Sequence, residues 1–116
     1  MVVEDNHDNM TTVKAVLGNR YRILAATDGE EGLQMARETR PDLILLDMAL
    51  PKMDGFTVVR NLKDNVELGN IPVIAMTAQV MKGDREKILE AGCDDYIAKP
   101  IDPEGFLIKI GEWLKK

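Results

Sequence analysis

The sequence is poor in several features, and each scarcity excludes a class of protein. Cys93 is the only cysteine, so an internal disulfide is impossible and a reducing, cytoplasmic location is expected. The longest strictly apolar runs are about four residues, whereas about 20 are needed to cross a bilayer. The first residues, Met1 to Asp5, turn acidic at once, so we expect neither a signal peptide nor a membrane anchor.

Positive charge is outweighed by negative charge. The chain has 15 Lys and Arg residues against 20 Asp and Glu residues, which gives a net charge of −5. Nucleic acids and anionic membrane surfaces both favour clustered Lys and Arg, so neither is expected as a direct partner. Apolar residues make up 45% of the 116 positions. This content excludes a disordered chain and predicts one domain, residues 1–116, with a hydrophobic core.

Short apolar runs alternate with helical patterns five times along the chain. We predict strands over 1–3, 21–26, 43–46, 72–76 and 95–98, and helices over 6–17, 28–38, 54–64, 84–91 and 103–116. Such an alternation predicts an α/β fold, a doubly wound parallel five-stranded sheet with helices on both faces. The continuous apolar run before Asp47 predicts that the third strand is buried on both faces.

Four predicted strands end in a chemically distinctive residue: Glu4-Asp5, Asp47, Thr77 and Lys99. Parallel strands point their carboxyl ends to the same edge of the sheet, so we expect these residues to meet in one shallow site. Three carboxylates repel one another unless a cation lies among them, and all-oxygen ligation suits Mg²⁺. A carboxylate nucleophile beside a hard cation, a lysine and a hydroxyl is suited to phosphoryl transfer.

Several of these residues have a simpler interpretation when taken alone. An Asp at a strand end is more often a turn or helix cap than a nucleophile, and Asp54, just before Gly55, fits that interpretation best. His7 lies near the acidic pair, but one His without Cys or His neighbours is typical of a solvated helix start. Cys93 is expected to be a small buried residue rather than a reactive thiol. Only the convergence of the strand ends favours chemistry at Asp47.

At these residues the chain resembles the receiver domain of two-component response regulators. The resemblance covers the whole length and rests on four stretches: Val3–Asn6, Leu45–Pro51 with Asp54-Gly55, Ala75–Ala78 and Asp95–Pro100. It implies a flavodoxin-like strand order of 2-1-3-4-5. It also implies a phosphorylation-controlled signalling switch that receives its phosphoryl group from a sensor histidine kinase or a histidine phosphotransfer protein.

The resemblance assigns the acceptor and the metal ligands. Asp47 matches the residue that accepts the phosphoryl group. Mg²⁺ is implied as the cofactor, held by Glu4, Asp5, Asp47 and the backbone carbonyl of Ala49. Such a domain is no conventional enzyme, although it assists its own phosphorylation and slow dephosphorylation.

The resemblance also assigns the residues that contact the phosphoryl group and those that change conformation in response to it. Thr77 and Lys99 match the residues that contact it, and Thr77 and Tyr96 match the switch pair. The Lys99–Pro100 peptide bond is implied to be cis. The face formed by the fourth helix, fifth strand and fifth helix would change shape and engage a downstream effector protein. A monomer or a weak, phosphorylation-dependent dimer is expected.

The chain departs from the family pattern at its first strand. Family members usually carry more apolar residues before the acidic pair, whereas only Met1 to Val3 precede Glu4 here. We therefore expect a shortened first strand, with fewer ladder hydrogen bonds and less buried area.

Two other classes of protein fit the sheet less well. A phosphatase or phosphotransferase with an aspartyl nucleophile commonly places a second Asp two residues later as general acid, and Ala49 occupies that position. A flavin carrier needs aromatic side chains around the ring, and aromatic residues are only 4% of this chain.

Overall fold

The computed structural model describes residues 1–50, 53–78 and 82–115, without the side chains of Lys82 and Asp84. Pro51, which belongs to one of the stretches quoted above, lies outside the described residues. Strands and helices alternate through the described part of the chain. They are β1 (Val2–Val3), α1 (His7–Leu17), β2 (Ala25–Ala26), α2 (Gly29–Thr39), β3 (Ile44–Asp47), α3 (Gly55–Asp64), β4 (Val73–Thr77), α4 (Lys82–Glu90), β5 (Asp95–Ala98) and α5 (Pro103–Leu114).

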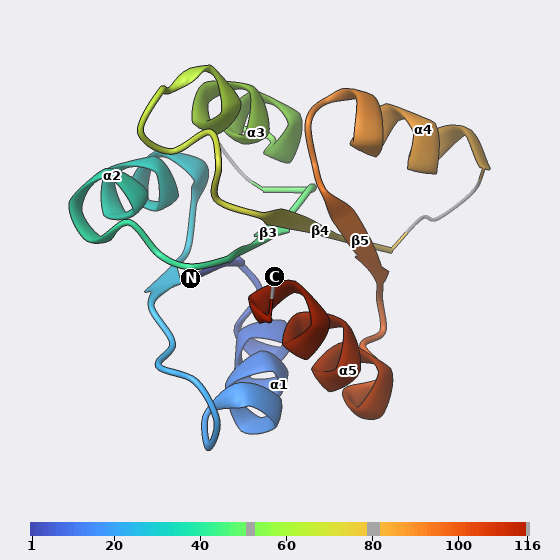
Figure 1. Cartoon of the computed structure of the whole chain (residues 1–116). Coiled ribbons are helices and arrows are strands. Elements are labelled where there is room, and N and C mark those ends of the chain that lie inside the picture. Colours follow the sequence, from blue (N-terminus) through green and yellow to red (C-terminus); the bar gives the residue numbers. More distant parts are fainter. Residues whose placement is uncertain (51–52, 79–81, 116) are drawn as a thin grey trace.

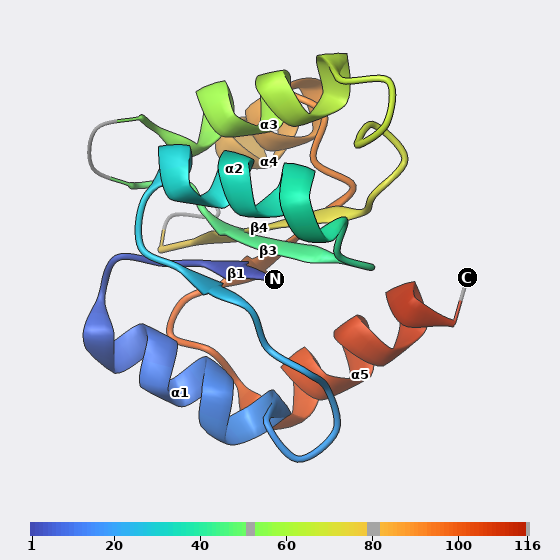
Figure 2. The ribbon, with the colours of Figure 1, turned by 90° about the vertical axis from the view of Figure 1, so that its left-hand side faces the viewer.

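The strands form one parallel sheet in the order β2-β1-β3-β4-β5. Helices α2, α3 and α4 cover one face of this sheet, and α1 and α5 cover the other (Figure 1). The turned view shows the same two helical layers with the sheet between them (Figure 2). The predicted doubly wound α/β fold with strand order 2-1-3-4-5 is therefore confirmed.

The central strand β3 contributes to both halves of the core. Ile44 and Leu46 belong to the cluster under α2 and α3, whereas Leu45 belongs to the cluster with Phe106 and Ile110 of α5. Alternate residues of a strand point to opposite faces, so a continuous apolar run is needed when both faces are covered. The prediction of a strand buried on both faces is confirmed.

Four helices begin after an Asn or Asp whose side chain accepts a hydrogen bond from the helical backbone. The pairs are Asn6 with the Asn9 amide, Asp28 with Glu31, Asp54 with Thr57 and Asp102 with Gly105, at 2.8–3.3 Å. These caps satisfy backbone donors that have no partner within the helix. Asp54 is thus a helix cap, as its simpler interpretation predicts.

The predicted strand over 21–26 is wrong in its extent, because only Ala25–Ala26 pairs with β1. A parallel strand needs a neighbouring backbone, and β1 reaches no further back than Val2. Within the described residues, the backbone N–H groups of Leu24 and Leu43, on either side of β1, donate no hydrogen bond. Tyr21, Ile23 and Leu24 are half-buried and Arg22 is exposed, so the hydrophobic pattern of 21–24 reflects partial burial but cannot indicate pairing.

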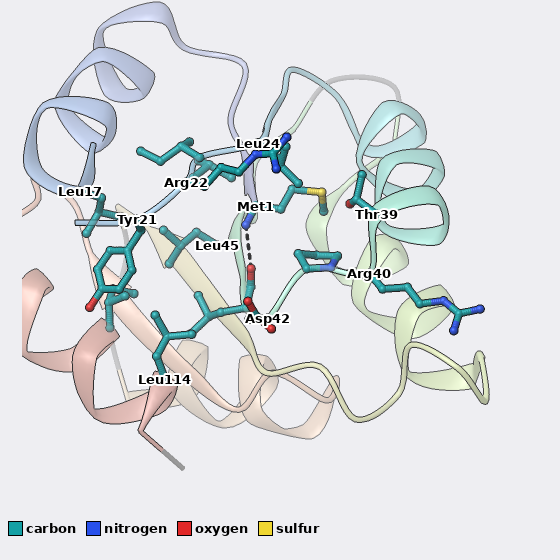
Figure 3. Close-up of a pocket in the computed structure, with 15 residues that line it drawn as sticks. Met1, Leu17, Tyr21, Arg22, Leu24, Thr39, Arg40, Asp42, Leu45 and Leu114 are labelled. Carbon is teal, nitrogen blue, oxygen red and sulfur yellow. Dashed lines mark hydrogen bonds between the residues drawn. The ribbon is translucent and has the colours of Figure 1, made fainter. Parts of the chain in front are cut away.

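A cavity of about 360 Å³ lies at this amino-terminal end of β1. Figure 3 shows its lining, with Leu17, Tyr21, Leu45 and Leu114 around it. The amino group of Met1 donates to the carbonyl of Leu43 at 2.8 Å. Burial lowers the pKa of this amino group to about 6, although the nearby Asp42 carboxylate opposes the shift. The sheet is therefore least complete where β1 starts.

An apolar extension fused to Met1 tests this interpretation. We expect Val-Ile-Leu added before Met1 to continue β1 between residues 21–23 and 41–43. The gain in buried apolar area exceeds the cost of ordering three residues, so the free energy of unfolding rises by about 1–3 kcal/mol in urea denaturation. A Gly-Ser-Gly extension removes the same amino group without adding apolar side chains and is the matched control. Equal stability of the two extended proteins would contradict the interpretation.

Candidate functional site

The register of the sheet places the candidate residues at one edge. Val3, Leu46, Ala75 and Tyr96 pair in a single row across β1, β3, β4 and β5. The distinctive strand-end residues all follow this row by only a few positions in their own strands. Because all strands are parallel, these residues emerge on the same side of the sheet.

Three carboxylates converge there. Glu4, Asp5 and Asp47 each offer one oxygen, and these oxygens lie within 4.8 Å of one another. Glu4 is 1% exposed and Asp47 is 4% exposed, whereas Asp5 is exposed. Two of the carboxylates are therefore fixed inside the protein, and the third lies at its surface.

Lys99 supplies the opposing charge. Its Nζ lies 3.1 Å from both carboxylate oxygens of Glu4 and 3.4 Å from Oδ1 of Asp47. The Lys99–Pro100 peptide bond that follows β5 is cis. The lysine thus contacts both buried carboxylates, although it comes from the other end of the chain.

Neutral donors complete the contacts of the two buried carboxylates. The Asn9 side chain donates from Nδ2 to Oε1 of Glu4 at 2.8 Å. The backbone N–H of Ala49 donates to Oδ1 of Asp47 at 3.0 Å. These contacts hold each carboxylate in one orientation, which is what a preorganised site requires.

Burial raises the pKa of Glu4, and the adjacent Asp47 carboxylate raises it further. The hydrogen bond from Asn9 and the contact with Lys99 oppose this rise without cancelling it. Three carboxylates facing one lysine leave an excess of negative charge in a partly buried place. An oxygen-preferring divalent cation would remove this excess, so the donor set fits Mg²⁺.

The carboxylates open onto a cavity of about 560 Å³. Thr77 and Ala49 line it together with the apolar side chains of Phe56 and Ile88. Gly55 allows the chain after β3 to fold back closely, because a Cβ there would lie 2.6 Å from the Cα of Met48. The space beside Asp47 is therefore large enough for a small anionic group and open to solvent on one side.

Tyr96 lies apart from this cluster. Its backbone pairs with Ala75, but it is not among the residues that line the cavity. Its ring is half-buried, with the guanidinium carbon of Arg85 5.2 Å and the Nζ of Lys109 5.1 Å from the ring centre. Of the residues predicted to bind the metal, contact the phosphoryl group or form the switch, the structure places Tyr96 outside the acidic site.

Asn9 is a site residue that sequence reasoning missed. It lies in the first turn of α1, whose N-cap Asn6 fixes the phase of the helix directly after the acidic pair. That phase turns the Asn9 amide back toward Glu4. A polar residue five positions after a buried carboxylate, at the start of a capped helix, is the signal that would have identified it.

The profile of the response regulator receiver domain family matches residues 1–110. The chain belongs to this family. Among curated relatives, the polar-differentiation response regulator DivK of Brucella anthropi is 46% identical over 115 residues, which cover 98% of this chain and 94% of the relative. DivK of Brucella ovis is 45% identical with the same coverage.

Solved structures of receiver domains have the same fold. The receiver domain of the sensor histidine kinase PA1611 from Pseudomonas aeruginosa matches with a TM-score of 0.91 and 35% identity, covering 99% of this chain and 95% of that one. Its structure contains a magnesium ion coordinated in the active site cleft. The receiver domain of Saccharomyces cerevisiae Ssk1, in complex with the histidine phosphotransfer protein Ypd1, matches with a TM-score of 0.88 and 27% identity, covering 97% and 85%.

The protein is therefore a two-component receiver domain that acts in phosphorylation-controlled signalling. The alternative of a phosphatase or phosphotransferase is not favoured. Among the described helices of this receiver domain, none has both the length and the apolar character needed to span a bilayer.

Magnesium binding at the acidic cluster can be tested by thermal unfolding. We expect Mg²⁺ to raise the Tm of the receiver domain, because a ligand that binds only the folded state stabilises it, by about 2.7 kcal/mol at 100 times its Kd. Asp5→Asn removes an exposed oxygen ligand without disturbing the core, so the apparent Mg²⁺ affinity falls about tenfold or more. The control Asp8→Asn removes an equal charge from the first turn of α1, outside the cluster. An equal loss of Mg²⁺ affinity in both variants would mean that the affinity depends only on the net charge of the protein.

Proposed function

We propose that Asp47 of this receiver domain accepts a phosphoryl group in a Mg²⁺-dependent reaction. The observation that supports this most strongly is the position of Asp47, buried between Lys99 and a second buried carboxylate, with the mouth of a cavity in front of it. A buried carboxylate with a lysine and two acidic neighbours is poorly explained as a structural feature, because neutral residues would be more stable there.

The two oxygens of Asp47 have different environments. Oδ1 accepts from the Ala49 N–H and faces Lys99, which leaves Oδ2 to form the new P–O bond. The P–N bond of a phosphohistidine donor breaks in the same transfer, and the leaving imidazole nitrogen takes up a proton. A Mg²⁺ ion held by Glu4, Asp5, Asp47 and the Ala49 carbonyl would neutralise the phosphoryl oxygens.

We propose further that this receiver domain assists its own phosphorylation and dephosphorylates slowly. Ala49, two residues after the acceptor, offers no acid or base for rapid turnover. A long-lived phosphoryl group is what a signalling switch requires.

Thr77 and Tyr96 are proposed as the switch pair. Thr77 pairs with Ala98, and Ala75 pairs with Tyr96. Paired residues of parallel strands, and residues two apart in one strand, share a face of the sheet. Thr77 and Tyr96 therefore lie diagonally on one face, and Ala75 and Ala98 occupy the other two corners of the same group of four residues. A shift of Thr77 toward a phosphoryl group on Asp47 would open space into which the Tyr96 ring turns.

We propose that the phosphoryl donor is a sensor histidine kinase or a histidine phosphotransfer protein, by analogy with the Ssk1 receiver domain bound to Ypd1. A downstream effector protein would bind the α4-β5-α5 face; α4 and α5 each carry an exposed large hydrophobic residue, Leu89 and Ile108. Residues 1–116 are proposed as one receiver domain with a shortened β1, cytoplasmic, and a monomer or a weak phosphorylation-dependent dimer.

Incubation with Mg²⁺ and acetyl phosphate, followed by intact mass spectrometry, tests the acceptor. We expect the mass of one phosphoryl group to be added to the native chain and not to Asp47→Asn, since an amide oxygen is a poor nucleophile. Asp54→Asn is the matched control, because Asn retains the helix cap while the same change in charge is made seven residues away. Phosphorylation of Asp47→Asn at the native level would refute the assignment.

Thr77→Ala separates phosphorylation from switching. We expect this variant to gain the phosphoryl mass but to lose most of the change in Trp113 fluorescence that accompanies it. The reason is that a hydrogen bond to a charged group, about 1.5–3 kcal/mol, is lost from the phosphorylated state. Thr77→Ser keeps the hydroxyl and should restore the change. A normal fluorescence response in Thr77→Ala would show that the hydroxyl does not couple the site to α5.

A further inference from the structure

Two cations from different helices lie close to the Tyr96 ring. Arg85 of α4 lies 5.2 Å from the ring centre, and Lys109 of α5 lies 5.1 Å from it. Cation–π contacts at this distance are attractive. The ring therefore connects α4, β5 and α5 across the proposed effector face.

Lys109 is fixed independently of the ring. Its Nζ donates to the carbonyl of Tyr96 at 2.9 Å and to Oδ1 of Asp95 at 3.3 Å. Asp95 is in turn held by the Trp113 indole N–H at 2.8 Å and by the Tyr96 backbone N–H at 2.8 Å. The group formed by Arg85, Tyr96, Lys109, Asp95 and Trp113 is called the tyrosine clamp below.

Asp95 carries its negative charge at neutral pH. Burial alone would raise the pKa of Asp95, but the hydrogen bonds from Trp113 and Tyr96 and the charge of Lys109 lower it overall. An ionised Asp95 keeps Lys109 beside the ring. Arg85 is exposed, and its guanidinium contacts the Tyr96 ring.

We propose that the tyrosine clamp opposes the inward turn of Tyr96 and so sets the threshold of the switch, with Arg85 and Lys109 as positioning residues. This proposal rests on the proposed function, because it concerns the movement of Tyr96 toward Thr77. A ring that turns inward leaves both cations, whereas the orientation seen here keeps them. Removing a cation therefore favours the inward orientation and strengthens binding of the phosphoryl group that stabilises it.

The simpler alternative is that the two cations only stabilise the folded chain. The two interpretations predict opposite results for Arg85→Gln. A contact that only stabilises the fold lowers the Tm and leaves phosphoryl binding unchanged or weaker. If the contact acts as a clamp, Arg85→Gln makes phosphoryl binding tighter. The variant destabilises only the ligand-free orientation of Tyr96, because the inward orientation does not make this contact.

The test is a titration of the full chain with beryllium fluoride, a mimic of the phosphoryl group, at saturating Mg²⁺. Bound fluoride is measured by ¹⁹F NMR, and α5 is followed by the fluorescence of Trp113, the only tryptophan. Arg85→Gln is expected to lower the midpoint concentration by about two- to fivefold, the fold-change that one exposed cation–π contact corresponds to. Lys87→Gln removes the same charge from an exposed position on α4 and should leave the midpoint unchanged.

Two further variants identify the ring as the partner of Arg85. Tyr96→Phe keeps the ring, so adding Arg85→Gln to it should still lower the midpoint. Tyr96→Leu removes the ring, so adding Arg85→Gln to it should have no effect. Equal midpoints for the native chain, Arg85→Gln and Lys87→Gln would overturn the clamp while leaving the proposed function intact. Failure of the native chain to bind beryllium fluoride or to gain the phosphoryl mass would reject both.

Discussion

The structure depends on keeping two buried carboxylates, Glu4 and Asp47, beside one lysine. Like charges in a poorly solvated place repel, and Lys99 can neutralise only part of the total. The fold sustains this arrangement because each carboxylate lies at the carboxyl end of a strand that is packed on both faces, so neither can withdraw into solvent. Lys99 is delivered from β5, three strands away from β1. The sheet therefore acts as a rigid frame that holds a charge excess in place, which is the property needed to bind a cation and a phosphoryl group.

Much of this arrangement is predictable because it follows from local rules. Parallel strands align their ends, so apolar runs ending in Glu4, Asp47, Thr77 and Lys99 already imply one site. Helix starts are equally local, since Asn and Asp caps lie within three residues of the amides that they satisfy. The extent of β2 is not local, because residues 21–24 become a strand only if a neighbouring backbone lies beside them. The tyrosine clamp was not predicted either, since Arg85 and Lys109 meet at Tyr96 only after α4 and α5 have packed.

The two ends of β1 have opposite problems. At its carboxyl end, the negative charge exceeds the positive charge that the surrounding residues supply. At its amino end, a cavity remains between the sheet and the elements packed around it. The first problem belongs to function, since functional sites commonly lower stability. The cavity lies at the amino end of β1, whereas the acidic site lies at the carboxyl ends of the strands. A change that fills the cavity beside Met1 is thus expected to alter stability without altering the site.

The clamp and the phosphoryl contacts act on the same ring in opposite directions, and their sizes can be compared. Reversing a 1:99 equilibrium to 99:1 takes about 5.5 kcal/mol. In the proposed switch, a hydrogen bond from Thr77 to a phosphoryl group would contribute about 1.5–3 kcal/mol, and a charge contact with Lys99 would add a similar amount. Two cation–π contacts at a partly exposed ring contribute about 1–2 kcal/mol in total. On these figures the proposed clamp is too weak to block the switch, but it would raise the phosphoryl-binding energy that the inward turn of Tyr96 requires.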